Sequence, residues 1–234
     1  MFDLRPSLKL HTSMSFHATV FMRRYWVVFF LGLIAGPAAF GQAANSPIAF
    51  VNREAITTTF VSAPFLGTNG NQSASRGANW LQVEFHYGTT AALTTPFLDE
   101  VEFKVWIEGL DLQATDAPVK GQGVAVGLTG SVTYVNVPAG KDIYGVFYVH
   151  PNTLARYSST RGYEDFDQKF NIHIEAYIGG AKMDYFDKKK ENDPNWFQQL
   201  RVVPNLVYRQ DQCPFLIYSP DRYPAIKLPA ATGQ

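Results

Sequence analysis

Two short motifs pair a carboxylate with an imidazole two positions apart. They are Glu84-x-His86 and His173-x-Glu175. Residues two apart on a β-strand share a face, so each motif would present two metal-binding groups on one side of a strand. If the two strands were neighbours, these four side chains could hold a divalent metal ion. Without any standard zinc spacing, the favoured interpretation is that they are polar residues on solvent-facing strand positions.

A second group of candidates consists of aromatic residues outside the inward-facing pattern. Trp106 falls on the polar face of its own strand, and Tyr185, Trp196 and Tyr223 fall in predicted loops. Exposed aromatic rings could stack on sugar rings or dock a protein partner, since they combine a large contact area with a polar group. We treat these four residues as candidate binding residues. The alternative is that Trp106 is buried beneath a loop or a second layer of structure.

The sequence lacks the motifs of common enzyme classes. It contains no Gly-x-Ser-x-Gly elbow, no Gly-x-x-x-x-Gly-Lys phosphate loop and no His-Glu-x-x-His pair. We therefore expect neither catalytic residues nor a cofactor, with a hydrolase as a distant third hypothesis. Twenty basic residues balance twenty acidic ones, so charge gives no reason to expect a nucleic-acid partner.

The elements that must position these residues are predicted to be strands. Apolar and polar residues alternate over Trp80–Tyr87, Val101–Glu108 and Ile172–Ile178, as on half-buried antiparallel strands. Ile143–Val149 is apolar on both faces, which predicts a central strand. Further strands are predicted at Ile48–Val61, Val124–Leu128, Ser131–Val137, Leu206–Tyr208 and Phe215–Tyr218, with turns at Gly67–Gly70, Gly127–Gly130, Pro138–Gly140 and Gly179–Gly180.

Few helix signals accompany these strands. Asn152–Ser159 and Asn195–Leu200 each follow a proline and could form one or two helical turns. The fold class predicted is all-β: an antiparallel, Ig-like β-sandwich over residues 44–218 with one or two short helices and long decorated loops. A closed barrel is the alternative. Asp184–Asp193 is predicted to be a charged loop, and residues 219–234 a Pro-rich extended tail.

The N-terminal region has the layout of a signal peptide. Arg23-Arg24 precede the apolar run Tyr25–Ala39, which small residues follow. The run is shorter than the roughly 20 residues that a membrane-spanning helix needs, so we expect residues 1–43 to be removed and no stable transmembrane anchor to remain. A start at Met22 would place the arginines at the front of the signal. We therefore expect export to the periplasm, the outer membrane or the cell surface of a Gram-negative-type bacterium.

The chain contains one cysteine, Cys213. A single cysteine forms no disulfide within the chain. The favoured interpretation is a small buried apolar residue, and an intermolecular disulfide is the alternative.

Five segments over residues 80–228 follow one another in a characteristic order. They are Trp80–Phe85, Val101–Gly109, Tyr144–Pro151, Glu175–Ile178 and Pro214–Pro220. This order resembles a family of secreted proteins of Akkermansia-type bacteria (Verrucomicrobia) that are encoded alongside type-IV-pilus-like genes. The resemblance implies an Ig-like fold, secretion and association with pilus-like assembly, and it brings no catalytic residues.

Two hypotheses of function follow. The first is a non-catalytic structural or interaction protein of a pilus-like surface or outer-membrane system, with a protein partner or self-assembly. The second is a secreted carbohydrate-binding module that would bind a glycan through exposed aromatic rings. We favour the first, because lone binding modules are usually attached to an enzyme and this chain has room for one domain.

Overall fold

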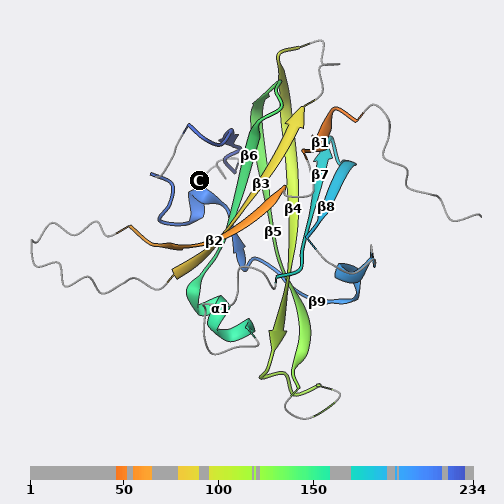
Figure 1. Cartoon of the computed structure of the whole chain (residues 1–234), viewed down its shortest axis with the longest axis vertical. Helices are drawn as coiled ribbons and strands as arrows, with labels where there is room; N and C mark the ends of the chain where they lie inside the picture. The colour runs from red at the N-terminus through yellow and green to blue at the C-terminus, as the bar shows by residue number, and fades with distance from the viewer. Residues whose placement is uncertain are drawn as a thin grey trace, which may run out of the picture. The chain divides into compact units, whose positions relative to one another are not determined.

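The structure of the chain is a computed structural model (Figure 1). Every described residue belongs to one compact unit within Gly41–Gln234. We call it the second unit. The predicted signal peptide lies outside the described residues. These are 46–51, 55–64, 79–89, 95–117, 119, 122–158, 170–188, 193, 195–217 and 221–229.

The second unit contains two β-sheets, as predicted. All strand pairs are antiparallel except β5 with β9, which is parallel. The first sheet, sheet A, consists of β1 (Ile48–Phe50), β2 (Ile56–Ser62), β3 (Asn79–Thr89), β6 (Ile143–Val149) and β10 (Val207–Tyr208). Sheet B consists of β4 (Phe97–Asp111), β5 (Val124–Pro138), β7 (Ile172–Ile178), β8 (Ala181–Asp187), β9 (Arg201–Val203) and β11 (Ala225–Ile226).

The core lies between the inner faces of the two sheets. Val83, Phe85 and Tyr87 of β3 alternate with outward polar residues, and all three are fully buried. The Phe85 ring of sheet A packs 4.7 Å from the Phe103 ring of sheet B, centroid to centroid. This arrangement confirms the predicted alternation on both strands and the sandwich architecture, since aromatic pairs at this separation fill the space between stacked sheets.

The β4–β5 hairpin is the longest pair of strands in the described unit (Figure 1). The predicted break at Gly127–Gly130 is wrong, because β5 continues through it as one strand. Val207 of β10 crosses so close to Gly130 that a Cβ atom there would lie 2.3 Å from the Val207 carbonyl oxygen. The glycine therefore permits a close approach of two strands rather than a turn.

Two other sequence predictions differ from the structure. Asp184–Asp187 belongs to β8 and not to a charged loop, because Gly179 and Gly180 form a tight turn with positive φ that folds β8 back on β7. The described residues of the predicted Phe215–Tyr218 strand form turns. Phe215 instead directs its ring onto the outer face of sheet A, where it stacks on Tyr148.

The helical elements are short, as predicted. They are α1 (Pro151–Tyr157), which Pro151 begins, and two 3₁₀ helices, η2 (Trp196–Gln199) and η3 (Gln210–Gln212). None of the helices in the described part of the chain has the length and apolar character needed to cross a bilayer. We call residues 221–229 the C-terminal segment. It adds β11 to the edge of β5, with Ala225 opposite Val135.

Candidate functional site

The two carboxylate–imidazole motifs lie on opposite outer faces of the sandwich. Glu84 and His86 project from β3 in sheet A, whereas His173 and Glu175 project from β7 in sheet B. The strands are not neighbours, so the structure does not assemble the four-ligand arrangement. Within the described residues, no group of three or more His, Cys, Asp or Glu is placed to hold a metal ion. Each motif instead has its own partners.

Glu84 holds the C-terminal segment against sheet A. Its two carboxylate oxygens accept hydrogen bonds from Arg222 Nη2 at 2.7 Å and Arg222 Nε at 2.8 Å. Tyr223 Oη donates a third at 2.8 Å. The ion pair with Glu84 raises the pKa of the Arg222 guanidinium, which is charged in any case. Burial and the neighbouring Glu84 carboxylate raise the pKa of Tyr223, so its hydroxyl remains a donor.

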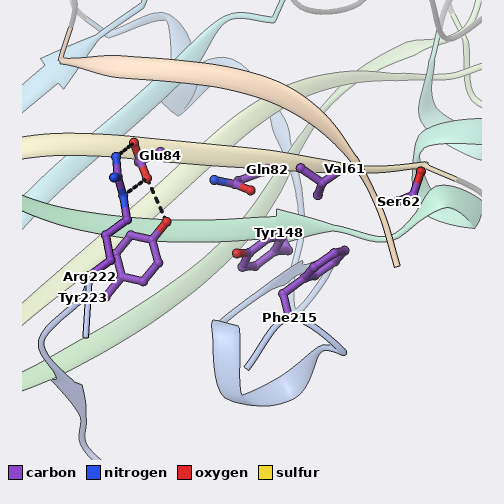
Figure 2. Close-up of a pocket in the computed structure, with 8 residues that line it drawn as sticks. All are labelled: Val61, Ser62, Gln82, Glu84, Tyr148, Phe215, Arg222 and Tyr223. Carbon is purple, nitrogen blue, oxygen red and sulfur yellow. Dashed lines mark hydrogen bonds and ion pairs between the residues drawn. The ribbon is translucent and has the colours of Figure 1, made fainter. Parts of the chain in front are cut away.

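These contacts form one end of a groove of about 530 Å³ on the outer face of sheet A (Figure 2). Tyr148 and Phe215 form its other end, with ring centroids 4.7 Å apart and planes within 10°. Both rings are almost fully buried, so their faces are used for packing against each other. The residues that line the groove are Val61, Ser62, Gln82, Glu84, Tyr148, Phe215, Arg222 and Tyr223.

A stack of three side chains extends from the groove along sheet A. The Arg222 guanidinium lies 4.4 Å from the centre of the Tyr144 ring. The other contact of Tyr144 is His86, whose ring is parallel to it at 4.5 Å. His86 Nε2 lies 3.3 Å from the Asp142 carboxylate. Arg222 therefore gains a cation–π contact in addition to its ion pair with Glu84.

The C-terminal segment also borders an exposed apolar surface. Three large apolar side chains here are more than half exposed: Leu216 at 53%, Ile217 at 61% and Leu228 at 71%. We call these three residues the apolar patch. A second groove of about 360 Å³ runs beside Leu216 and Leu228, with Pro224 and Ile226 also in its wall. Apolar surface of this kind is typical of an interaction site.

On the opposite sheet, His173 lies in a buried cluster of charged and aromatic groups. Its side chain is almost fully buried, with Nδ1 at 2.9 Å from Asp187 Oδ1 and Nε2 at 3.3 Å from Glu175 Oε1. The Nδ1 contact is a hydrogen bond, whereas the Nε2 contact has only the geometry of an ion pair. The Phe197 ring of η2 covers the imidazole face, parallel to it at 3.7 Å.

Glu175 and Asp187 each have a further partner. Tyr177 Oη and Lys182 Nζ both donate to Glu175, at 2.5 and 3.1 Å. Burial alone would raise the pKa of Glu175, but the close contact with His173 and the hydrogen bonds from Tyr177 and Lys182 outweigh it and lower that pKa to about 2. Asp187 Oδ1 accepts from Trp196 Nε1 at 2.8 Å. Asp187 Oδ1, on β8, is thus hydrogen-bonded to both His173 of β7 and Trp196 of η2.

The four candidate aromatic residues do not form one platform. Trp196 is buried, and Trp106 is half-buried with its ring 5.0 Å from that of Phe197. Tyr185 is 40% exposed beside His173. Tyr223 lies on the other sheet, bonded to Glu84. The predicted alternative for Trp106, burial beneath another layer, is therefore the closer description of its environment.

Sequence reasoning missed the residues that complete both clusters. Arg222 lies in the predicted tail, Asp187 in the predicted charged loop and Phe197 in the predicted helical turn Asn195–Leu200. One feature of the sequence could have indicated the sheet A cluster. Arg222 and Tyr223 are adjacent hydrogen-bond donors in a Pro-rich tail, and such donors need acceptors elsewhere in the chain. Cys213 is half-buried, its Sγ donates to the Gln210 carbonyl oxygen at 3.2 Å, and burial raises its thiol pKa to about 11.

The fold and these two surfaces define an all-β domain of two packed sheets. A family model matches residues 42–230, well over half of the chain. The chain therefore belongs to this family, the pilus-associated family of Akkermansia-type Verrucomicrobia that the sequence resembles. No curated protein matches the chain.

Solved structures also resemble this chain. One is the crystal structure of a protein from Akkermansia muciniphila, which is 18% identical in sequence with a TM-score of 0.61. The match covers 78% of this chain and 93% of that chain. At this level of identity the likeness shows a shared fold, and it supports the all-β sandwich.

Proposed function

We propose that this protein is a non-catalytic interaction protein of a pilus-like surface system and that it binds a protein partner through the apolar patch. The observation that carries the proposal is the exposure of Leu216, Ile217 and Leu228, of which Leu216 and Leu228 line one groove. Large apolar side chains clustered at a surface favour association, because their burial against a partner releases water from apolar area. Membership of a pilus-associated family supports a protein partner from a pilus-like surface system.

The two carboxylates of the carboxylate–imidazole motifs support a structural role over a catalytic one. Glu84 accepts three hydrogen bonds from Arg222 and Tyr223, and Glu175 accepts from Tyr177 and Lys182. A general acid or base needs a free position next to the substrate. Of the four aromatic candidates, only Tyr185 is well exposed, so the glycan alternative has less support than a protein partner.

Site-specific photo-cross-linking in the source bacterium tests the proposal. A photoreactive phenylalanine analogue would replace Ile217 in one strain and Leu228 in another. The matched control is Val202 of β9, an apolar residue that is 54% exposed away from the apolar patch. We expect the same discrete cross-linked protein from both patch positions and none from Val202. Absence of a cross-link at both patch positions, in a folded and exported protein, would disprove the proposal.

The proposal also covers the cellular location of the mature protein. We propose export through the predicted signal peptide, with the mature domain at the periplasmic or outer face of the envelope. Amino-terminal sequencing of the protein from fractionated cells tests this, and the expected mature start lies near residue 42 or 44. Recovery of the uncleaved chain from the cytoplasmic fraction would overturn it.

A further inference from the structure

The buried histidine of sheet B contributes nothing to the proposed partner surface, and its surroundings raise a separate question. His173 is 1% exposed, and both ring nitrogens face carboxylate oxygens. A neutral imidazole carries one N–H and one lone pair. Its lone pair would therefore face a carboxylate oxygen at 2.9 or 3.3 Å, which is a repulsive arrangement. The imidazolium, with two N–H groups, suits both neighbours.

The other groups around His173 agree with this assignment. From β7 it faces Glu175, which Tyr177 bonds, and from β8 it faces Asp187 and the Tyr185 ring. Lys182 of β8 is a cation that pairs with Glu175 and lies 5.6 Å from the centre of the Tyr185 ring. The contacts from β4 and η2 are the uncharged rings Trp106, Phe197 and, through Asp187, Trp196.

The imidazolium also holds η2 in place. Asp187 Oδ1 is shared between His173 Nδ1 and Trp196 Nε1. The Phe197 ring lies flat on the imidazole, where a positive charge is attracted to the aromatic face. Deprotonation of Nε2 would remove the cation–π attraction to Phe197 and the charge attraction to Glu175, while Nδ1–H and Trp196 Nε1 would still donate to Asp187. The segment that covers the outer face of sheet B would therefore keep its Asp187–Trp196 hydrogen bond and lose the attraction between Phe197 and the imidazolium.

We propose that His173 is a pH-sensitive pin, which as an imidazolium holds η2 firmly on sheet B and, on losing its proton, loosens η2 over Trp106. The closed arrangement, with η2 packed over His173, is the one that the structure shows. The proton leaves to solvent, and the two carboxylates keep their charge. Burial by itself lowers the pKa of His173, but Asp187 and Glu175 outweigh it and raise that pKa above its usual value. The imidazolium is therefore favoured below that raised pKa, and η2 opens more readily as the pH rises above it.

Two measurements on the purified wild-type protein test the pin. NMR of the imidazole nitrogens follows the protonation of His173, and hydrogen exchange follows the amides of Trp196–Gln199. We expect an imidazolium at pH 6 that titrates with a midpoint above 6.5. The exchange rates are first corrected for intrinsic base catalysis. The equilibrium constant for opening of η2 should then increase about tenfold for each pH unit in the range where His173 is protonated in the closed form and neutral in the open form. A neutral His173 at pH 6, or equal corrected protection at pH 6 and pH 9, would overturn the proposal.

Variants separate the pin from general alkaline loosening. Asp187→Asn keeps an acceptor for Trp196 but removes one negative charge, so the opening midpoint should shift to lower pH. Glu175→Gln should shift it in the same direction. His86→Gln is the matched control, because His86 lies on sheet A and contacts Tyr144. Its midpoint should equal that of the wild type, and an unshifted midpoint in Asp187→Asn would count against the pin.

Discussion

Glu84 and Arg222 are 138 positions apart in the sequence and form a bidentate ion pair on the outer face of sheet A. Arg222 belongs to the C-terminal segment, which also pairs with β5 of sheet B through β11. The segment therefore links the two sheets at the edge of the sandwich. Its position beside the apolar patch means that the same contact shapes the proposed partner surface.

We expect Arg222→Ala to loosen the C-terminal segment while the sandwich stays folded. The loss removes two hydrogen bonds to Glu84 and the cation–π contact with Tyr144. Arg222 is 45% exposed, so solvent screening limits the cost to about 1 kcal/mol of unfolding free energy. Hydrogen exchange on residues 221–229 and urea unfolding measure the two effects.

Lys227→Ala is the control for this prediction. Lys227 pairs with Glu100, and both side chains are about half exposed. An exposed pair of this kind contributes only a few tenths of a kcal/mol, so unfolding should be nearly unchanged. Equal losses in the two variants would show that the Glu84 contact has no special role.

A substitution at Gly145 tests the packing of sheet A. A Cβ atom there would lie 2.0 Å from Cζ of Phe85, its cross-strand partner. Gly145→Ala must therefore displace a core ring, and we expect a loss of about 3 kcal/mol in urea unfolding. Gly140→Ala is the matched control, because its nearest neighbour would be 4.0 Å away. A stable Gly145→Ala would mean that Phe85 packs elsewhere.

The strands themselves could be predicted because their signal is local. Alternation over Val101–Glu108 specifies which side chains enter the core, and the structure confirms it. The same rule places His173 and Glu175 on the outer face of β7, where they are. It does not predict that they are buried, because the groups that cover them come from β8 and η2.

The long-range partners could not be read from spacing. Nothing near Glu84 indicates that its acceptors are filled by Arg222 from the far end of the chain. Gly130 shows the same limit, since a glycine in a strand and a glycine in a turn look alike until the crossing β10 is known. Composition and periodicity therefore predict the layers, whereas tertiary contacts determine the sites.

Tyr134→Phe tests a buried hydrogen bond of the core. The Val146 amide donates to Tyr134 Oη at 3.0 Å, and both residues are fully buried. The phenylalanine ring keeps the packing but leaves the amide without that acceptor. We expect a loss of about 1–3 kcal/mol of unfolding free energy. An unchanged urea midpoint would show that the amide finds another partner in the folded protein.

The acid side of the stability profile depends on Glu175. Its folded-state pKa is about 2, against an ordinary value of 4.5. A lowered pKa gives stability that is fully present above pH 4.5 and is lost as the pH falls toward 2. The size of the loss is on the order of 2 kcal/mol. Because His173 gives stability that is lost as the pH rises, the cluster is most stable between the two limits.

Urea unfolding of the wild type and Glu175→Gln between pH 2 and pH 6 measures this contribution. Glutamine carries no charge, so the variant should be less stable at pH 6 and its stability should fall less steeply with acid. Glu100→Gln is the control, because that side chain is half exposed and paired only with Lys227 among the described contacts. The assignment fails if Glu175→Gln and the wild type lose stability in parallel from pH 6 to pH 2, since the acid sensitivity would then arise from other carboxylates.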